Sequence, residues 1–354
     1  MERKLLTTAY TEQIQERTIA RSFFKKTLDI GISKTVEFDS RLLSNKAASR
    51  GNPKSGYNQN TVGAYATKHY SPVVYKESLG VSADSMLVKQ FGGISSILGN
   101  EQLKILPAFM KDVVVPKTQE IANKIVTDLD LQAIEILTTG GVASRDAFAG
   151  VSYIDSSDTN HFNTVSTVWT DNAAEPIKDL TALAKLIKIN GMKSISNIIM
   201  NDATFELLAS NASFKAAYET RRVDLGKIQL PANTRSSANY WGDVMINAKR
   251  VKIWVESAYY ENNAGVQTQF IPNNKVILIA DDNEFVQWFG SIARFKTNNN
   301  NLMDFLSGDF TLENNLKVSQ IAVADRFGLG LDIALDCSAL LVAKSKGFGC
   351  LTVG

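Results

Sequence analysis

The sequence contains little of what most catalytic and metal sites need. Only two histidines, His69 and His161, occur among its 354 residues, and neither lies in a metal-binding spacing such as His-Glu-x-x-His. Each histidine lies in a different region, and no local pattern places either one beside a nucleophile. A Ser-His-Asp or Cys-His site could form only if the fold happened to bring such residues together. No glycine-rich Walker loop for phosphate occurs either. The sequence therefore predicts no catalytic residues, no metal and no cofactor.

Cysteines and long apolar runs are scarce as well. The only cysteines, Cys337 and Cys350, cannot build a disulfide framework and are typical of a reducing compartment, where we expect both to be buried thiols. Met1 to Gln15 lacks the apolar run of a signal peptide, and no apolar stretch reaches the length of a membrane span. We expect a protein made in the cytosol that does not enter a membrane.

The chain also has no large excess of positive or negative charge. The net charge is +2, with 44% hydrophobic and 21% charged residues, which is ordinary globular composition and no electrostatic trap for nucleic acid. The chain is long enough for one large domain or two medium ones. The acidic run from Asp281 to Glu284 lacks the spacing of a calcium loop, so a solvated turn is favoured.

The longest helical pattern in the chain covers residues 116–139. Pro116 suits a first helical turn, and Gly140 with Gly141 suits a left-handed end. A helix of this length spans roughly 30 Å. Three acidic side chains are interpreted as its solvent-exposed face: Asp128, Asp130 and Glu135. The apolar residues recur three or four positions apart and share one face: Ile121, Ile125, Leu129, Ala133, Ile136 and Leu137.

A long polar stretch lies between Leu43 and Tyr75. It is rich in Ser, Asn, Gly and Lys and has almost no large aliphatic residue before Val73. Turn-forming residues fill its centre, its flanks look extended, and residues 35–39 before it alternate as a strand does. So long a polar segment within a compact domain needs an explanation. It is either a surface loop or an arm that becomes ordered across a neighbouring molecule.

The pattern changes after Pro176. A helix is predicted from Pro176 to Asn190 with a stop at Gly191, followed by a buried strand at 197–200 and a helix at 202–210 that Asn201 caps. This density of helix and strand favours a small α/β domain. Further strands are predicted at 250–255, 276–280, 318–323, 329–335, 340–342 and 349–353.

The order of these segments resembles the major capsid proteins of tailed bacteriophages, in the family named after the lambda major capsid protein E. No single motif carries the likeness, which rests on the order and spacing of six stretches. These are residues 35–39 followed by 47–51, then 63–72, 130–140, 169–180, 198–201 and 270–276.

The resemblance implies an α+β fold of the Hong Kong 97-like type. It would comprise an N-terminal arm (residues 1–34) and an extended β-hairpin loop (35–80). A peripheral domain (81–175 and 318–335) would contain the spine helix 116–139. An α/β axial domain would cover 176–317 and 336–354.

The resemblance also implies a structural protein, not an enzyme, that self-assembles into the icosahedral head shell around a phage genome. The implied partners are further copies in hexamers and pentamers, portal and scaffold proteins, a decoration protein, and packaged double-stranded DNA held non-specifically. The implied location is the virion capsid, after assembly in the host cytoplasm. The residues expected to contact a neighbouring subunit are in the extended loop: Arg50, Asn52, Lys54, Tyr57 and Lys68.

Two other functions stay open at this point. One is an encapsulin-like compartment, which shares the fold but stores enzymes instead of a genome. The other is a soluble α/β enzyme with an unrecognised site. A covalent crosslink through Lys54 or Lys68 has no local support in the sequence.

Overall fold

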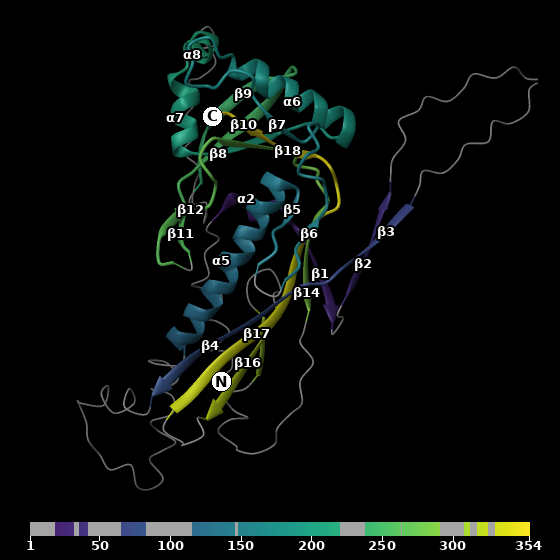
Figure 1. Ribbon diagram of the computed structural model, residues 1–354, viewed down its shortest axis with the longest axis vertical. Coiled ribbons are helices and arrows are strands. Elements are labelled where there is room, and N and C mark those ends of the chain that lie inside the picture. Colours follow the sequence, from purple (N-terminus) through teal and green to yellow (C-terminus); the bar gives the residue numbers. More distant parts are fainter. Residues whose placement is uncertain are drawn as a thin grey trace, which may run out of the picture.

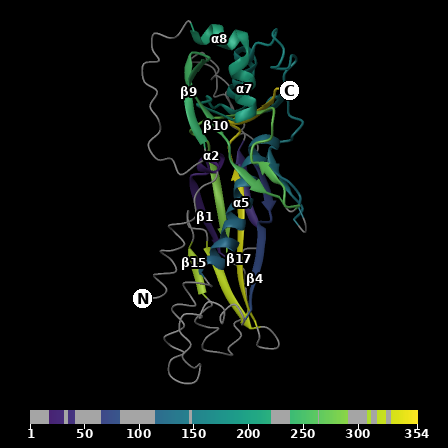
Figure 2. The ribbon, with the colours of Figure 1, turned by 90° about the vertical axis from the view of Figure 1, so that its left-hand side faces the viewer.

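The computed structural model describes residues 18–31, 35–41, 65–82, 115–145, 148–219, 238–262, 264–290, 308–311, 317–324 and 330–354. The described part is elongated, with a helix-covered sheet at one end and a long, narrow sheet at the other (Figure 1). The long strands β4 and β17 run beside the helix α5 along the same axis (Figure 2).

The long sheet is organised around one central strand, β17 (Gly330–Ala343). β4 (Val73–Ser82) pairs antiparallel along one edge. β16 (Lys317–Ala324) and β14 (Phe285–Gly290) lie end to end along the other. β1 (Lys26–Gly31) extends the sheet next to β14, and β15 (Gly308–Thr311) extends it next to β16. Two separate strands were predicted here, but β17 is unbroken across residue 335, where the predicted domain boundary falls.

The helix α5 (Val115–Thr139) lies against this sheet and confirms the helix predicted over 116–139. Ile121, Ile125 and Leu129 on its apolar face are at most 1% exposed. Gly140 ends the helix with a φ of +84°, a conformation in which a Cβ is strained. A Cβ here would also stand 2.4 Å from the carbonyl oxygen of Ile154. The predicted left-handed end is confirmed.

The second sheet carries the helices of the α/β region. Its strand order is β7-β18-β13-β8-β10-β9. The strands are β7 (Phe162–Thr164), β8 (Asn197–Asn201), β9 (Ala238–Ile246), β10 (Lys249–Glu256), β13 (Lys275–Ile279) and β18 (Phe348–Thr352). The helices are α6 (Pro176–Gly191), α7 (Asp202–Ser210) and α8 (Ala212–Glu219).

Local signals set the ends of these helices. Asn201 caps α7 as predicted, because its side-chain oxygen accepts a hydrogen bond from the backbone N–H of Thr204 at 2.8 Å. The left-handed residue that ends α6 is Met192, one position beyond the predicted stop. Gly191 serves a different purpose, because a Cβ there would stand 2.2 Å from the carbonyl oxygen of Lys346.

Alternate residues of the second sheet face two separate apolar layers. On β8, Ile198 and Met200 pack against the helices, whereas Ile199 faces the other side. β13 repeats the pattern, with Leu278 towards the helices and Ile277 towards the other side. This period of two is the normal consequence of strand geometry, and it leaves the second face free to join the rest of the molecule.

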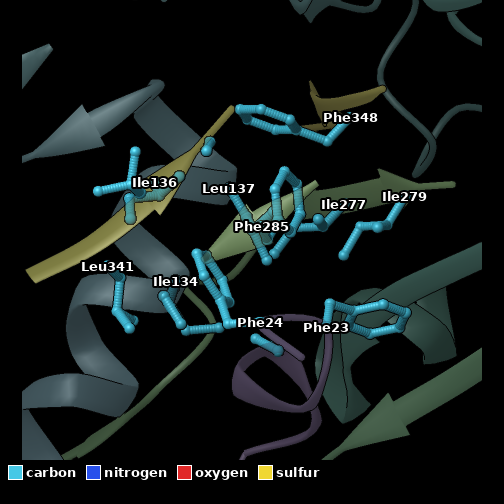
Figure 3. Packing of buried hydrophobic residues seen from close by; sticks show 14 of the residues in the cluster. Phe23, Phe24, Ile134, Ile136, Leu137, Ile277, Ile279, Phe285, Leu341 and Phe348 are labelled. Carbon is cyan, nitrogen blue, oxygen red and sulfur yellow. The ribbon is translucent and has the colours of Figure 1, made fainter. Parts of the chain in front are cut away.

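That second face forms the joint between the two sheets, which we call the joint core. It combines residues of the second sheet, the C-terminal end of α5, the first residues of β14, the last residues of β17, and the short helix α2 (Ile19–Ser22). Phe285 lies at its centre, with ring centroids 4.9 Å from Phe24 and 5.4 Å from Phe348 (Figure 3). One continuous core therefore spans both sheets.

Three two-stranded ribbons complete the described chain. They are β2 (Val36–Arg41) with β3 (Tyr65–Tyr70), β5 (Gly141–Val142) with β6 (Val151–Ser152), and β11 (Tyr259–Glu261) with β12 (Gln267–Gln269). No helix in the described ranges is long and apolar enough to cross a membrane.

Candidate self-association surfaces

The ribbon of β2 and β3 is the element that stands furthest from the body of the molecule (Figure 1). Its strands pair in register from Val36 opposite Tyr70 to Arg41 opposite Tyr65. Among the described strands, each pairs only with the other. An isolated two-stranded ribbon is marginally stable in water at best.

The root of this ribbon is fixed to the body by two tyrosines. Tyr70 is 8% exposed and meets the edge of Tyr153 at a centroid distance of 5.2 Å. The Tyr153 hydroxyl donates a hydrogen bond to the carbonyl oxygen of Leu341 on β17 at 2.6 Å. Burial raises the pKa of Tyr153 well above its ordinary value, so this hydroxyl stays a donor.

Only one of the five predicted contact residues lies in the described chain. Lys68 is on β3, opposite Phe38 of β2. The other four, Arg50, Asn52, Lys54 and Tyr57, fall within residues 42–64, which lie outside the described ranges. Their role in contacting a neighbouring subunit stays a prediction.

The predicted solvent face of α5 is wrong. Asp130 is fully buried, and its Oδ1 lies 3.7 Å from a terminal guanidinium nitrogen of Arg21, which is itself 2% exposed. Asp128 and Glu135 are both half-buried partners of Arg145. The sequence held a usable signal, because the two residues four positions from Asp130 on its helix face, Val126 and Ile134, are apolar. Both are 3% exposed in the structure.

A polar cluster fastens the same side of α5 to the long sheet. The Tyr75 hydroxyl on β4 donates to Asp128 Oδ2 at 2.5 Å and accepts a hydrogen bond from Gln132 Nε2. The side-chain oxygen of Gln132, Oε1, in turn accepts a hydrogen bond from the backbone N–H of Leu341 at 3.3 Å. Burial, followed by the Asp128 carboxylate, raises the pKa of Tyr75 well above its ordinary value. α5 is therefore held to both β4 and β17.

Large apolar side chains are exposed on several described elements. They lie on two strands of the long sheet, at the end of α6 and in the segment before it, and on the β11–β12 ribbon. The side chains at least two-fifths exposed are Leu28, Val74, Val168, Ile189, Met192, Tyr259 and Val266.

One of the two histidines and both cysteines lie in the cores, whereas His69 on β3 is exposed. His161 is buried, with its Nδ1 2.9 Å from the carbonyl oxygen of Phe348. Cys337 and Cys350 are free and buried, as predicted, and burial raises the pKa of Cys350 to about 12. Among the described residues, no group of His, Cys, Asp and Glu is arranged to hold a metal ion.

The acidic run at residues 281–284 is a turn tied to its surroundings. Asp282 forms an ion pair with Lys193 at 2.9 Å. The Asn283 amide donates to the carbonyl oxygen of Gly347 at 2.9 Å. Asp281 and Asp282 are exposed, so the predicted solvated turn is confirmed.

Comparison with known families gives one match over most of the chain. Residues 15–314 match the sequence model of the family described as phage major capsid protein E. No curated protein sequence matches the chain.

Solved structures resemble the chain over nearly its whole length. A prophage protein of Escherichia coli CFT073, assigned as a capsid protein, has a TM-score of 0.61 at 11% identity, covering 100% of this chain and 99% of its own. The capsid protein of cyanophage A-1(L) has a TM-score of 0.56 at 13% identity, covering 96% and 94%. A phage-related protein of Bordetella bronchiseptica RB50 has a TM-score of 0.50 at 10% identity, covering 98% and 96%.

Proposed function

This chain belongs to the phage major capsid protein E family, and from that premise we propose how its copies hold together in the capsid shell. The α+β, Hong Kong 97-like fold predicted from the sequence is confirmed, and the chain is a structural protein of the virion capsid, where it assembles into multimeric shells. The observation that carries the proposal is the β2–β3 ribbon, which leaves the body and pairs with no other described strand.

The ribbon and the loop it carries lie across the adjacent subunit in the shell. Arg50, Lys54 and Lys68 supply positive charge for acidic residues there, and Asn52 and Tyr57 supply hydrogen bonds and contact area. Each exposed ion pair is worth only about 0–1 kcal/mol. Stability comes from repetition, because obligate interfaces bury on the order of 2,000 Å² or more and each subunit forms several.

The division of labour within one subunit follows the two sheets, although β14 and residues 336–343 of β17, expected in the axial domain, belong to the long sheet. The peripheral domain, with α5 as a stiff bar against the long sheet, keeps the curvature of the shell uniform. The axial domain, built on the second sheet, lies at the centre of each hexamer or pentamer. The joint core supports this arrangement because it fixes the angle between the two sheets.

The further partners proposed are portal and scaffold proteins, a decoration protein and packaged double-stranded DNA, with assembly in the host cytoplasm. A net charge of +2 is consistent with a shell that holds DNA weakly, because strongly basic linings bind phosphate tightly.

Deletion of Ser49 to Gly56 tests the proposal. We expect subunits with unchanged far-UV circular dichroism and lost or aberrant shells in negative-stain images. A second variant replaces the same segment with Gly and Ser at equal length, which separates loss of side chains from loss of reach. Normal shells from both variants would show that this segment does not hold neighbours together.

The contents of native shells distinguish the alternatives. We expect nuclease-protected double-stranded DNA in particles from infected cells. Shells that enclose a protein cargo and no DNA would instead favour an encapsulin-like compartment. A subunit that stays monomeric in size-exclusion chromatography at all salt and crowding conditions would favour a soluble α/β enzyme.

A further inference from the structure

A buried cluster of ionisable side chains ties the N-terminal end of the described chain to both sheets. We call Thr18 to Phe24, which includes α2, the latch segment. The Thr18 hydroxyl donates to Glu256 Oε2 at 2.8 Å, at the end of β10 in the second sheet. Arg21 lies 3.7 Å from Asp130 of α5, and both side chains are buried. The latch segment therefore bridges the second sheet and α5.

Among the described side chains of this cluster, the carboxylates would outnumber the cations if every group ionised. Arg21 from the latch segment and Asp130 from α5 compensate one another, and the register neighbours of Glu256 on β8 and β9, Asn201 and Ala238, carry no charge. An ionised Glu256 would add a second buried carboxylate, and it forms no ion pair with any cation in the described part of the chain, so its charge would be costly. At 2% exposed, Glu256 has little water to stabilise that charge.

The proton therefore remains on Glu256 at neutral pH. Burial, together with the nearby Asp130 carboxylate, raises the pKa of Glu256 from 4.5 to about 8, against the hydrogen bonds that it accepts from Thr18 and the backbone of Ile19. A protonated carboxyl still accepts both hydrogen bonds and brings no net charge into the core.

We propose that the latch segment is a proton-dependent latch, which stays docked between α5 and β10 while Glu256 is protonated and is released when that proton is lost. This inference goes beyond the assembly proposal, because it concerns a joint within a single subunit. Release would carry Phe23 and Phe24 out of the joint core, where the carbonyl oxygen of Phe24 accepts from Gln287 Nε2 at 2.6 Å. The angle between α5 and the second sheet would then be less firmly held.

The direction of the pH effect follows from proton linkage. The docked state holds its proton up to about pH 8, whereas a released Glu256 has its ordinary pKa of 4.5. Docking is therefore strongest below pH 4.5, the ordinary pKa of the carboxyl group. It weakens as the pH rises from there to about 8, the pKa in the docked state, and changes no further above that pH. Within this window, the opening constant rises by up to about tenfold per pH unit.

Amide hydrogen exchange on the full-length protein at several pH values tests the latch. The amide of Phe24, which donates to the backbone carbonyl oxygen of Arg21 at 2.9 Å, is one of the reporters. After correction for intrinsic exchange, its protection should fall by roughly tenfold per pH unit between about pH 5 and pH 8. In Glu256→Gln, which keeps the hydrogen bond from Thr18 but cannot ionise, protection should stay within about twofold. The matched control Glu261→Gln, at an exposed carboxyl on β11, should keep the wild-type slope.

Two outcomes would overturn the proposal: protection that does not change with pH in the wild type, or the same slope in Glu256→Gln. A second measurement covers the case in which Glu256→Gln does not fold. Infrared spectra of the wild type labelled with ¹³C at glutamate carboxyls should show a protonated carboxyl band at pH 7 that fades around pH 8. Absence of that band at pH 7 would also overturn the proposal.

Discussion

At the residue scale, two glycines with similar φ angles distinguish two costs of adding a side chain: backbone strain and steric overlap with neighbouring atoms. Gly140 and Gly265 have φ values of +84° and +76°. A Cβ on Gly265 would meet nothing closer than 3.8 Å, whereas one on Gly140 would stand 2.4 Å from the backbone oxygen of Ile154. Gly265→Ala should cost about 1 kcal/mol through left-handed strain alone.

Gly140→Ala should cost more, on the order of 3 kcal/mol, because the end of α5 must also move. Denaturant unfolding of both variants measures the difference. Equal losses would mean that the backbone around Ile154 yields freely, so that only the strain matters.

The buried thiols give a second prediction at this scale. With its pKa raised to about 12, mainly by burial, Cys350 carries a negligible fraction of thiolate at pH 8, and the thiolate is the reactive form. Native protein should therefore resist maleimide labelling at Cys350, and the unfolded chain should label quickly. Mass spectrometry of peptides after timed labelling provides the measurement. Fast labelling of native shells would show that the β13–β18 region opens readily.

At the element scale, the length of α5 could be predicted from the sequence, but the ion-pair partner of its buried Asp130 could not. Its period, Pro116 and Gly140 are local signals, so the bounds agree to within one residue. The burial of Asp130 depends on Arg21, which lies far away in the chain. Similarly, β17 forms one strand because β4 pairs along most of its length, a tertiary cause that no local pattern contains.

The ribbon shows the same limit for the candidate site. Its flanking strands follow from local alternation, and the structure describes them as β2 and β3. The predicted role of Arg50, Asn52, Lys54, Tyr57 and Lys68 concerns surfaces of other copies. A single chain cannot specify which residues meet there.

The buried face of α5 allows a direct stability prediction. Leu129→Ala removes a side chain that is fully buried, and it should cost about 2–5 kcal/mol in the free energy of unfolding. The matched control Lys124→Ala, on the exposed side of the same helix where it pairs with Glu120 at 3.9 Å, should stay within about 0.5 kcal/mol. A small loss for Leu129→Ala would mean that the helix repacks against β17.

At the scale of the whole molecule, the question is whether the two sheets unfold together. The joint core is continuous between them, so the wild-type subunit should show a single cooperative transition. Trp288 lies in the long sheet, and Trp254 lies in the second sheet. One variant keeps Trp288 and lacks Trp254, and the other keeps Trp254 and lacks Trp288. The midpoint of unfolding in denaturant that Trp288 reports should therefore equal the midpoint that Trp254 reports.

Removal of the central ring of the joint should separate the transitions. Phe285 stacks on Phe24 and meets the edge of Phe348, so Phe285→Ala leaves a cavity where the two sheets share their packing. We expect the midpoints reported by Trp288 and Trp254 to diverge. The control Phe214→Ala removes a ring, 3% exposed, from the layer between the helices and the second sheet. It should lower the free energy of unfolding, but the midpoints reported by Trp288 and Trp254 should stay equal because the joint core remains intact. If Phe285→Ala still unfolds in one step, the polar contacts of α5 with β4 and β17 are sufficient to couple the two sheets, and the joint core is not what makes the subunit rigid.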